Sequence, residues 1–320
     1  MNGFGYVFEN EIQKTFTVKR MLTTVIVIVL AAIVMALSLL GGPSKEDWRQ
    51  YVSSQIEESQ KWIAELSTDL NENRDLIVEE QQHIALLKYR LDNDCPPTES
   101  VFLFVFDAFA METVLILLCV ITAVFVVCNE YTNRTILPLL TSGDKRQSII
   151  LAKLLTTLIY VTGVLVAYIV VSVVIGCVFF ASNGFSTTYL VVENGAIVHK
   201  DIVGQIFGAV VIEFSRLTTY TLLAVMVATL VKNQTAAAVI VIGVWIFGGA
   251  LISMSSVDYR WLQLFILHSL EVLGSALTTH IDWGSKELNQ ALLMCVVYSV
   301  LFGITGTLCF CKMPLPKKYR

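Results

Sequence analysis

The sequence predicts an all-α membrane protein with six transmembrane helices, an N-terminal interfacial helix and an extracellular helical hairpin. Its composition is the first reason, because 55% of the 320 residues are hydrophobic and only 15% are charged, too apolar for one water-soluble domain. The second reason is a series of almost charge-free runs, each of roughly 20 residues or more, which is the length that crosses about 30 Å of hydrocarbon. A heptad pattern in the long polar stretch after the first run is the third.

The predicted spans follow one another along most of the chain. They are Met21–Leu40, Val101–Cys128, Ile149–Phe180, Gly204–Val231, Thr235–Met254 and Ala291–Cys311. Residues 1–20 alternate apolar and charged side chains and predict a helix lying on the membrane surface, with a secretory signal as the alternative. The resulting divisions are 1–20, a first span within 21–42, an outer segment 43–100, and the remaining spans within 101–320.

The distribution of Lys and Arg predicts the sidedness. If both termini are cytoplasmic, the inner segments hold twelve Lys and Arg against four acids. The stretch from Lys45 to Glu99 has thirteen acids and six bases. Because basic loops stay inside, both termini are predicted to be cytoplasmic.

The outer segment 43–100 has a seven-residue apolar repeat, formed by Ile56, Ile63, Leu70, Ile77, Ile84 and Leu91. Such a repeat is typical of packed helices. One continuous helix would be about 70 Å long, yet its two ends must return to the same membrane surface. We therefore expect an antiparallel helical hairpin that turns near Asn71–Asp75, either a spacer or an element with a substrate-sensing or gating role.

Another outer segment, Ser255–Glu287, precedes the last span. Its apolar residues could line one side of a helix, but the segment is too polar for a confident span. We expect a half-buried or re-entrant outer helix over 258–280.

Asp107, Glu112, Glu213 and Arg216 are ionisable residues that fall inside predicted spans. Glu112 lies sixteen residues before Cys128, and Arg216 lies sixteen residues before Lys232, so both sit about 24 Å along their helices. We therefore predict an ion pair between Glu112 and Arg216, with Glu213 as the alternative partner. The pair could latch two helices together or contact a transported substrate, or both residues could simply reach the outer interface.

Residues 129–147 form a short polar segment between the second and third spans. Its apolar residues, Ile136, Leu137, Leu139 and Leu140, are surrounded by charges, which favours an amphipathic helix that docks another protein. The segment resembles the cytoplasmic loop of type-2 ABC-transporter permeases, although Arg134 stands where that family often has Gly. The matching positions are Glu130, Tyr131, Asn133, Thr135, Leu139 to Ser142, Lys145, Arg146, Ile149 and Lys153.

The resemblance implies a permease that pairs with a second permease, identical or related, and with two cytoplasmic ABC ATPase subunits. It implies that segment 129–147 is a coupling helix, whose contact residues are Glu130, Tyr131, Arg134, Thr135, Leu139, Ser142, Lys145 and Arg146. The large outer loop is similar to that of Gram-positive peptide exporters. This likeness implies a bacterial plasma membrane location and export of amphipathic, antimicrobial or toxin-like peptides or related hydrophobic compounds.

Several other function classes lack support in the sequence. No segment has the Walker A pattern, so the chain is predicted to bind no cofactor itself, and ATP and Mg would belong to the ATPase subunit. The four His have no metal-ligand spacing, the seven Cys imply no disulfide framework, and nucleic acid is not an expected partner. The competing hypothesis is a membrane sensor or scaffold whose outer hairpin binds a ligand and whose inner loop recruits a signalling partner.

Overall fold

The computed structural model describes residues 3–40, 48–66, 74–96, 100–133, 135–136, 145–193, 196–253, 265–278, 281 and 283–312. The chain divides into two compact units. The first unit comprises Met1–Ala31, Phe109–Val171 and Gly208–Arg320, and the second comprises Ala32–Ala108 and Ser172–Phe207.

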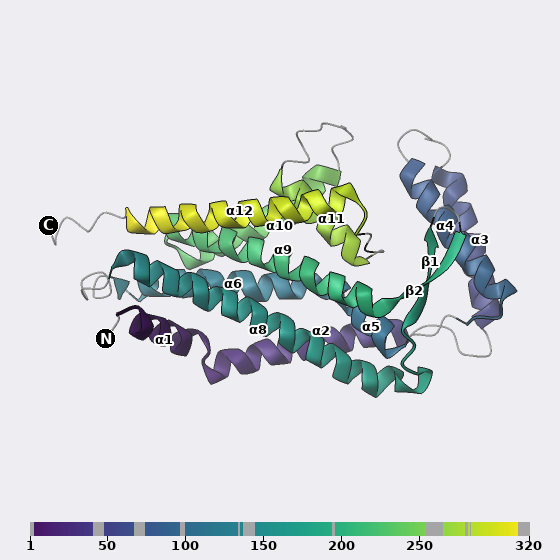
Figure 1. Cartoon of the computed structure of the whole chain (residues 1–320), viewed down its shortest axis with the longest axis horizontal. Helices are drawn as coiled ribbons and strands as arrows, with labels where there is room; N and C mark the ends of the chain where they lie inside the picture. Colours follow the sequence, from purple (N-terminus) through teal and green to yellow (C-terminus); the bar gives the residue numbers. More distant parts are fainter. Residues whose placement is uncertain are drawn as a thin grey trace. The chain divides into compact units, whose positions relative to one another are not determined.

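Helices dominate the described chain (Figure 1). In chain order they are α1 (Gly3–Thr15), α2 (Val18–Leu40), α3 (Trp48–Leu66), α4 (Arg74–Asp92), α5 (Val101–Asp107), η2 (Ala108–Met111), α6 (Glu112–Thr132), α8 (Arg146–Phe180), η3 (Ala181–Asn183), α9 (Ile202–Val231), α10 (Gln234–Ser253), α11 (Ile266–Thr278) and α12 (Lys286–Cys311). Within the described residues, five stretches are long and apolar enough to cross a membrane: Val18–Leu40, Val101–Thr132, Arg146–Asn183, Ile202–Val231 and Lys286–Cys311. The chain is therefore a multi-pass helical membrane protein.

Two of the predicted spans differ in detail from the observed helices. The predicted second span consists of α5 and α6, which are joined by the short 3-10 helix η2. The predicted fifth span falls on α10, whose apolar stretch Gln234–Gly248 is shorter than the five candidate spans. A sixth crossing thus remains a prediction.

Within the first unit, α11 packs against both α12 and α10, and α10 packs against α6. Ser269, Leu270, Leu273 and Leu277 are buried on α11, a spacing of one helical face. Of the predicted outer helix over 258–280, Ile266–Thr278 is helical, and residues 258–264 and 279–280 lie outside the described residues.

In the second unit, the start of α3 packs against the end of α4. Trp48 and Val52 are buried in a cluster with Leu87, and Leu91 packs beside them. Arg49 forms an ion pair with Asp94 at 2.6 Å at the same end. The predicted turn at 71–75 lies outside the described residues except for its last two positions, which belong to α4.

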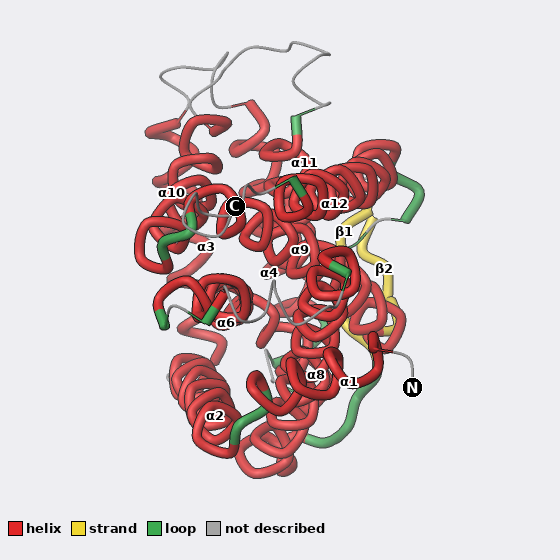
Figure 2. The backbone as a smooth tube through the Cα atoms, turned by 90° about the vertical axis from the view of Figure 1, so that its left-hand side faces the viewer, coloured by secondary structure: helices red, strands yellow, loops and turns green. Residues whose placement is uncertain are grey.

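One element departs from the predicted all-α architecture. Strands β1 (Thr188–Glu193) and β2 (Ala196–Asp201) form an antiparallel hairpin, shown in yellow in Figure 2. Thr188 lies opposite Asp201, and Glu193 lies opposite Ala196. The strands are rich in β-branched and aromatic residues, which favour the extended backbone.

Candidate functional site

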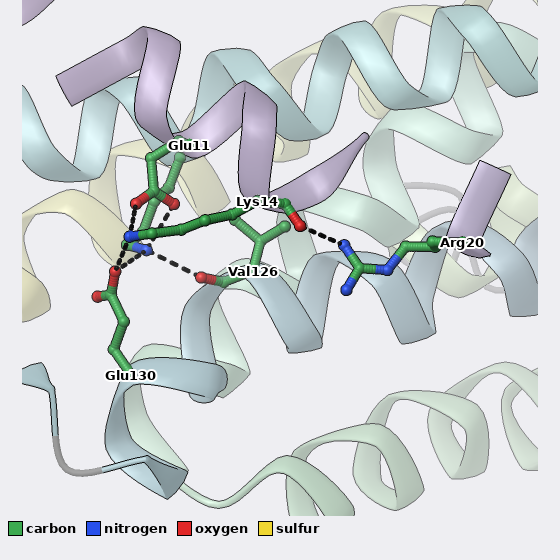
Figure 3. A network of polar contacts seen from close by, with 6 residues as sticks. Glu11, Lys14, Arg20, Val126 and Glu130 are labelled. Atoms are coloured by element: carbon green, nitrogen blue, oxygen red, sulfur yellow. Dashed lines mark hydrogen bonds and ion pairs between the residues drawn. The ribbon is translucent and has the colours of Figure 1, made fainter. Parts of the chain in front are cut away.

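A group of charges, buried except for the exposed Lys14, joins α1 to α6 and α8, and we call it the α1 cluster: Glu11, Lys14, Glu130 and Lys153. The Lys153 Nζ lies 2.8 Å from Glu11 Oε2 and 3.0 Å from Glu130 Oε1. It also donates a hydrogen bond to the carbonyl of Val126, at 2.9 Å. Lys14 Nζ lies 3.1 Å from Glu11 Oε1 and 3.4 Å from Glu130 Oε1 (Figure 3). Two cations and two carboxylates therefore neutralise one another.

Burial makes these ion pairs strong determinants of how α1 lies. Lys153 is 1% exposed, and Glu11 and Glu130 are almost as deeply buried. Burial by itself raises the pKa of the Glu11 carboxyl, but the charge and hydrogen bonds of Lys153 and Lys14 outweigh it and hold that pKa below its ordinary value. Burial likewise tends to lower the pKa of Lys14, but its two carboxylate partners raise it.

The sequence of α1 explains why this face turns inward. Val7, Glu11 and Thr15 are buried and recur every four residues, so they form one stripe along the helix. The end of α1 is closed by Arg20, whose Nη1 donates hydrogen bonds to the carbonyls of Lys14 and Thr15 at 3.0 and 2.8 Å. The Arg20 guanidinium also lies 3.9 Å from the centroid of the Phe125 ring.

The cluster changes the interpretation of the residues predicted to contact a partner. Glu130 and Tyr131 belong to the last turn of α6, and the Glu130 carboxylate is directed to Lys153 and Lys14. Glu130 is thus an internal anchor in this structure. Thr135 and Lys145 are exposed, whereas the Nη1 of Arg146 donates a hydrogen bond to the carbonyl of Cys311 at 3.0 Å. Arg134, Leu139 and Ser142 lie outside the described residues.

The second group of charges, which we call the Arg216 cluster, consists of Glu112, Glu213 and Arg216. The ion pair predicted from matching depth is present: Arg216 Nη2 donates to Glu112 Oε1 at 3.0 Å, and Nη1 contacts Glu112 Oε2. Arg216 Nη1 also lies 3.6 Å from Glu213 Oε2, one turn earlier on α9. The remaining predicted intramembrane charge, Asp107, ends α5 in the other unit and is half-buried.

A cavity of about 320 Å³ opens beside this cluster within the first unit. It is lined by Glu112, Arg216, Tyr220, Trp245, Leu267, Glu271, Gly274 and Ser275. Gly274 of α11 lies directly against the guanidinium, because a Cβ atom at this position would be 2.9 Å from Arg216 Nη2. The missing side chain therefore leaves Arg216 room to reach Glu112.

Sequence reasoning placed Glu112, Glu213 and Arg216 together but missed the roles of Glu11, Lys14 and Glu271. For α1 a usable signal exists, because Glu11 and Lys14 are an i,i+3 acid–base pair on the face that also bears Val7. No local pattern connects them with Lys153, which is 142 residues further along the chain than Glu11.

The fold and the two buried clusters define a multi-pass helical membrane protein with paired charges among its helices. Comparison with protein families adds that the chain belongs to the family described as protein of unknown function DUF2705, whose model matches residues 87–315. It is similar to the protein YhcI of Bacillus subtilis (strain 168), described as uncharacterized, with 21% identity over 265 residues. This match covers 82% of each chain. Neither description states an activity.

Proposed function

We propose that this chain is the transmembrane permease subunit of an ATP-driven ABC exporter of the type-2 class. A separate ATPase, which holds ATP and Mg, contacts segment 129–147 and moves the helices. Two ATPase subunits and a second permease, identical or related, complete the transporter. Its substrates are amphipathic peptides or related hydrophobic compounds, and its location is the bacterial plasma membrane.

One observation supports the coupling role above all. The α1 cluster contains Glu130, just after the start of segment 129–147, and Lys153, shortly after its end. Glu130 is paired with Lys14 of α1, and Lys153 is paired with Glu11 of α1. A force applied to the segment is therefore transmitted to α6, α8 and α1 together. Buried ion pairs suit this purpose because breaking one leaves an uncompensated buried charge.

The proposed sidedness has its own support. The end of α6, the start of α8 and α1 meet in the α1 cluster, and Arg146 at the start of α8 bonds to the last turn of α12. These helix ends therefore share one end of the first unit. The Lys and Arg of the corresponding segments favour the cytoplasmic side for both termini. In this topology α10 is the fifth of six crossings, and α3 and α4 form the extracellular hairpin.

The proposal is tested by purifying the full-length chain from its native cells in mild detergent. We expect a subunit with a Walker A motif to co-purify and to hydrolyse ATP. Charged residues in place of Leu139 and Leu140 should abolish this association. The control variant Trp62→Ala, an exposed position on α3, should retain it. Recovery of a signalling protein without nucleotide hydrolysis would instead favour a sensor or scaffold.

A further inference from the structure

The Arg216 cluster contains two carboxyl groups and one guanidinium. Among the described residues, Glu112 and Glu271 line the cavity with Arg216, while Glu213 is fully buried next to Arg216. Neither carboxylate oxygen of Glu213 has a hydrogen-bond partner among the described residues. Buried carboxylates are stable only when they are neutralised or paired, so one guanidinium cannot compensate several of them, and the others need a proton or another positive group.

Arg216 is placed to exchange partners. Its Nη2 bonds to Glu112 Oε1 at 3.0 Å, and its Nη1 is already 3.6 Å from Glu213 Oε2. A shift of about 0.8 Å would give the second contact the length of a charge-assisted hydrogen bond, roughly 2.8 Å. Arg216 could then stay paired with Glu213 while Glu112 faced the cavity without an internal cation.

The remaining walls suit a positively charged group. Tyr220 and Trp245 contribute aromatic surfaces, which attract cations. Glu271, exposed on α11, adds a second carboxylate beside Glu112. The volume of about 320 Å³ lies at the lower end of small-ligand pockets, roughly 300–1,000 Å³. It accommodates one side chain or head group and excludes a folded peptide.

We propose that this cavity binds the ammonium or guanidinium group of a basic amphipathic peptide, which replaces Arg216 on Glu112 while Arg216 moves to Glu213. This inference rests on the proposed export function and specifies its substrate class. Arg216 then takes the place of the substrate cation: it pairs with Glu112 when the cavity is empty and releases Glu112 when a substrate cation binds.

The test uses the full-length protein in phosphatidylcholine nanodiscs. The probe is a fluorescent amphipathic peptide of Leu and Lys, compared with the same peptide bearing acetylated lysines, and binding to empty discs is subtracted. We expect the lysine peptide to bind and the acetylated peptide to bind at least tenfold more weakly. Glu112→Gln should lower the affinity for the lysine peptide about tenfold. Glu57→Gln, at an exposed position on α3, is the control and should leave the affinity unchanged.

Two further variants separate this inference from its alternatives. Glu271→Gln alters an exposed cavity residue with little risk to folding, and it should weaken binding several-fold. The double variant Arg216→Leu with Glu213→Gln removes one cation and one carboxylate. Glu112 then has no guanidinium that competes with the peptide for it, so the lysine peptide should bind several-fold more tightly. Equal binding of both peptides, or unchanged affinity in Glu271→Gln, would overturn the inference. Loss of lysine-peptide binding in a double variant that still folds would contradict the role of Arg216 as a competitor for Glu112.

The binding measurement needs no ATPase, so the two proposals can fail separately. If an ATPase co-purifies but the lysine peptide does not bind, only the cavity's ligand is wrong. If the peptide binds as expected but no ATPase is recovered, the cavity stands as a cation site and the export function is rejected.

Discussion

Lys153 is the residue at which α1, α6 and α8 meet. Its Nζ bonds to carboxylates from α1 and α6 and to the carbonyl of Val126, so all three of its donors have an acceptor. A lysine that is 1% exposed persists only with such compensation, because an unpaired buried ammonium is costly. Lys153 therefore stabilises the docking of α1.

Replacing Lys153 by Met should destabilise the protein by about 3–5 kcal/mol, the typical cost of breaking a buried ion pair by removing one partner. Glu11 and Glu130 would be left with Lys14 as their cation. The free energy of unfolding in detergent, measured by denaturant titration, checks this result. Lys61→Met is the control, because its pair with Glu57 is exposed on both sides and should contribute nothing measurable. Equal stability of the two variants would show that the α1 cluster is not an anchor.

The pH dependence of α1 docking follows from the same residues. The pKa of Glu11 is lowered from 4.5, so its contribution is present above that value and is lost as the pH falls through the lowered pKa. The pKa of Lys14 is raised from 10.5, so its contribution is present below that value and is lost as the pH rises through the raised pKa. The charged groups that face Glu11 and Lys14 from other helices are Lys153 on α8 and Glu130 on α6.

We therefore expect α1 to stay docked between about pH 5 and 10 and to loosen in stronger acid or base. A spin label at Tyr6, which is 77% exposed on α1, reports this motion in a cysteine-free background. Its mobility should be constant across that window and rise only outside it, and Glu11→Gln should raise the mobility within the window. A transition near neutral pH would contradict the proposed anchoring.

At the scale of elements, Gly306 of α12 lies against the backbone of α9. A Cβ atom there would lie 3.4 Å from the Cα of Met226, so a larger side chain meets backbone. Gly303, three residues earlier, has no heavy atom of the described residues within 4 Å of its Cβ position. Small residues at helix crossings allow such close packing in membranes.

This difference supplies a matched pair of variants. Gly306→Leu should destabilise the protein by about 1–3 kcal/mol, because overpacking forces the helices apart. Gly303→Leu makes the same chemical change on an open face and should cost much less. Both variants can be compared by thermal unfolding in the same detergent. A larger loss for Gly303→Leu would contradict the helix packing described here.

How far the sequence determines these elements depends on the range of the interactions. Apolar run length placed the candidate spans, and equal counts along two helices placed Glu112 beside Arg216. The strands β1 and β2 were missed although Asn194-Gly195 between two β-branched runs is a strong hairpin signal. Pairing of Glu11 with Lys153 could not be predicted, because it depends on how three helices pack and leaves no local pattern.

At the scale of the whole molecule, the central claim is that a separate motor moves these helices through segment 129–147. The described neighbours of that segment are joined to α1 by the α1 cluster and to α12 by the bond between Arg146 and Cys311. A displacement imposed there would therefore reach α1, α6, α8 and α12. No comparable set of bonds was expected from the sequence motif alone.

The most direct measurement is site-specific photo-crosslinking in intact native cells. A photoreactive amino acid at Ser142 is compared with the same amino acid at Trp62, exposed on α3. The account predicts that Ser142 crosslinks to a subunit with a Walker A motif and that Trp62 does not. Labelling of Ser142 by a membrane-impermeant reagent from outside the cell, or crosslinks from Ser142 to partners that hydrolyse no nucleotide, would contradict it.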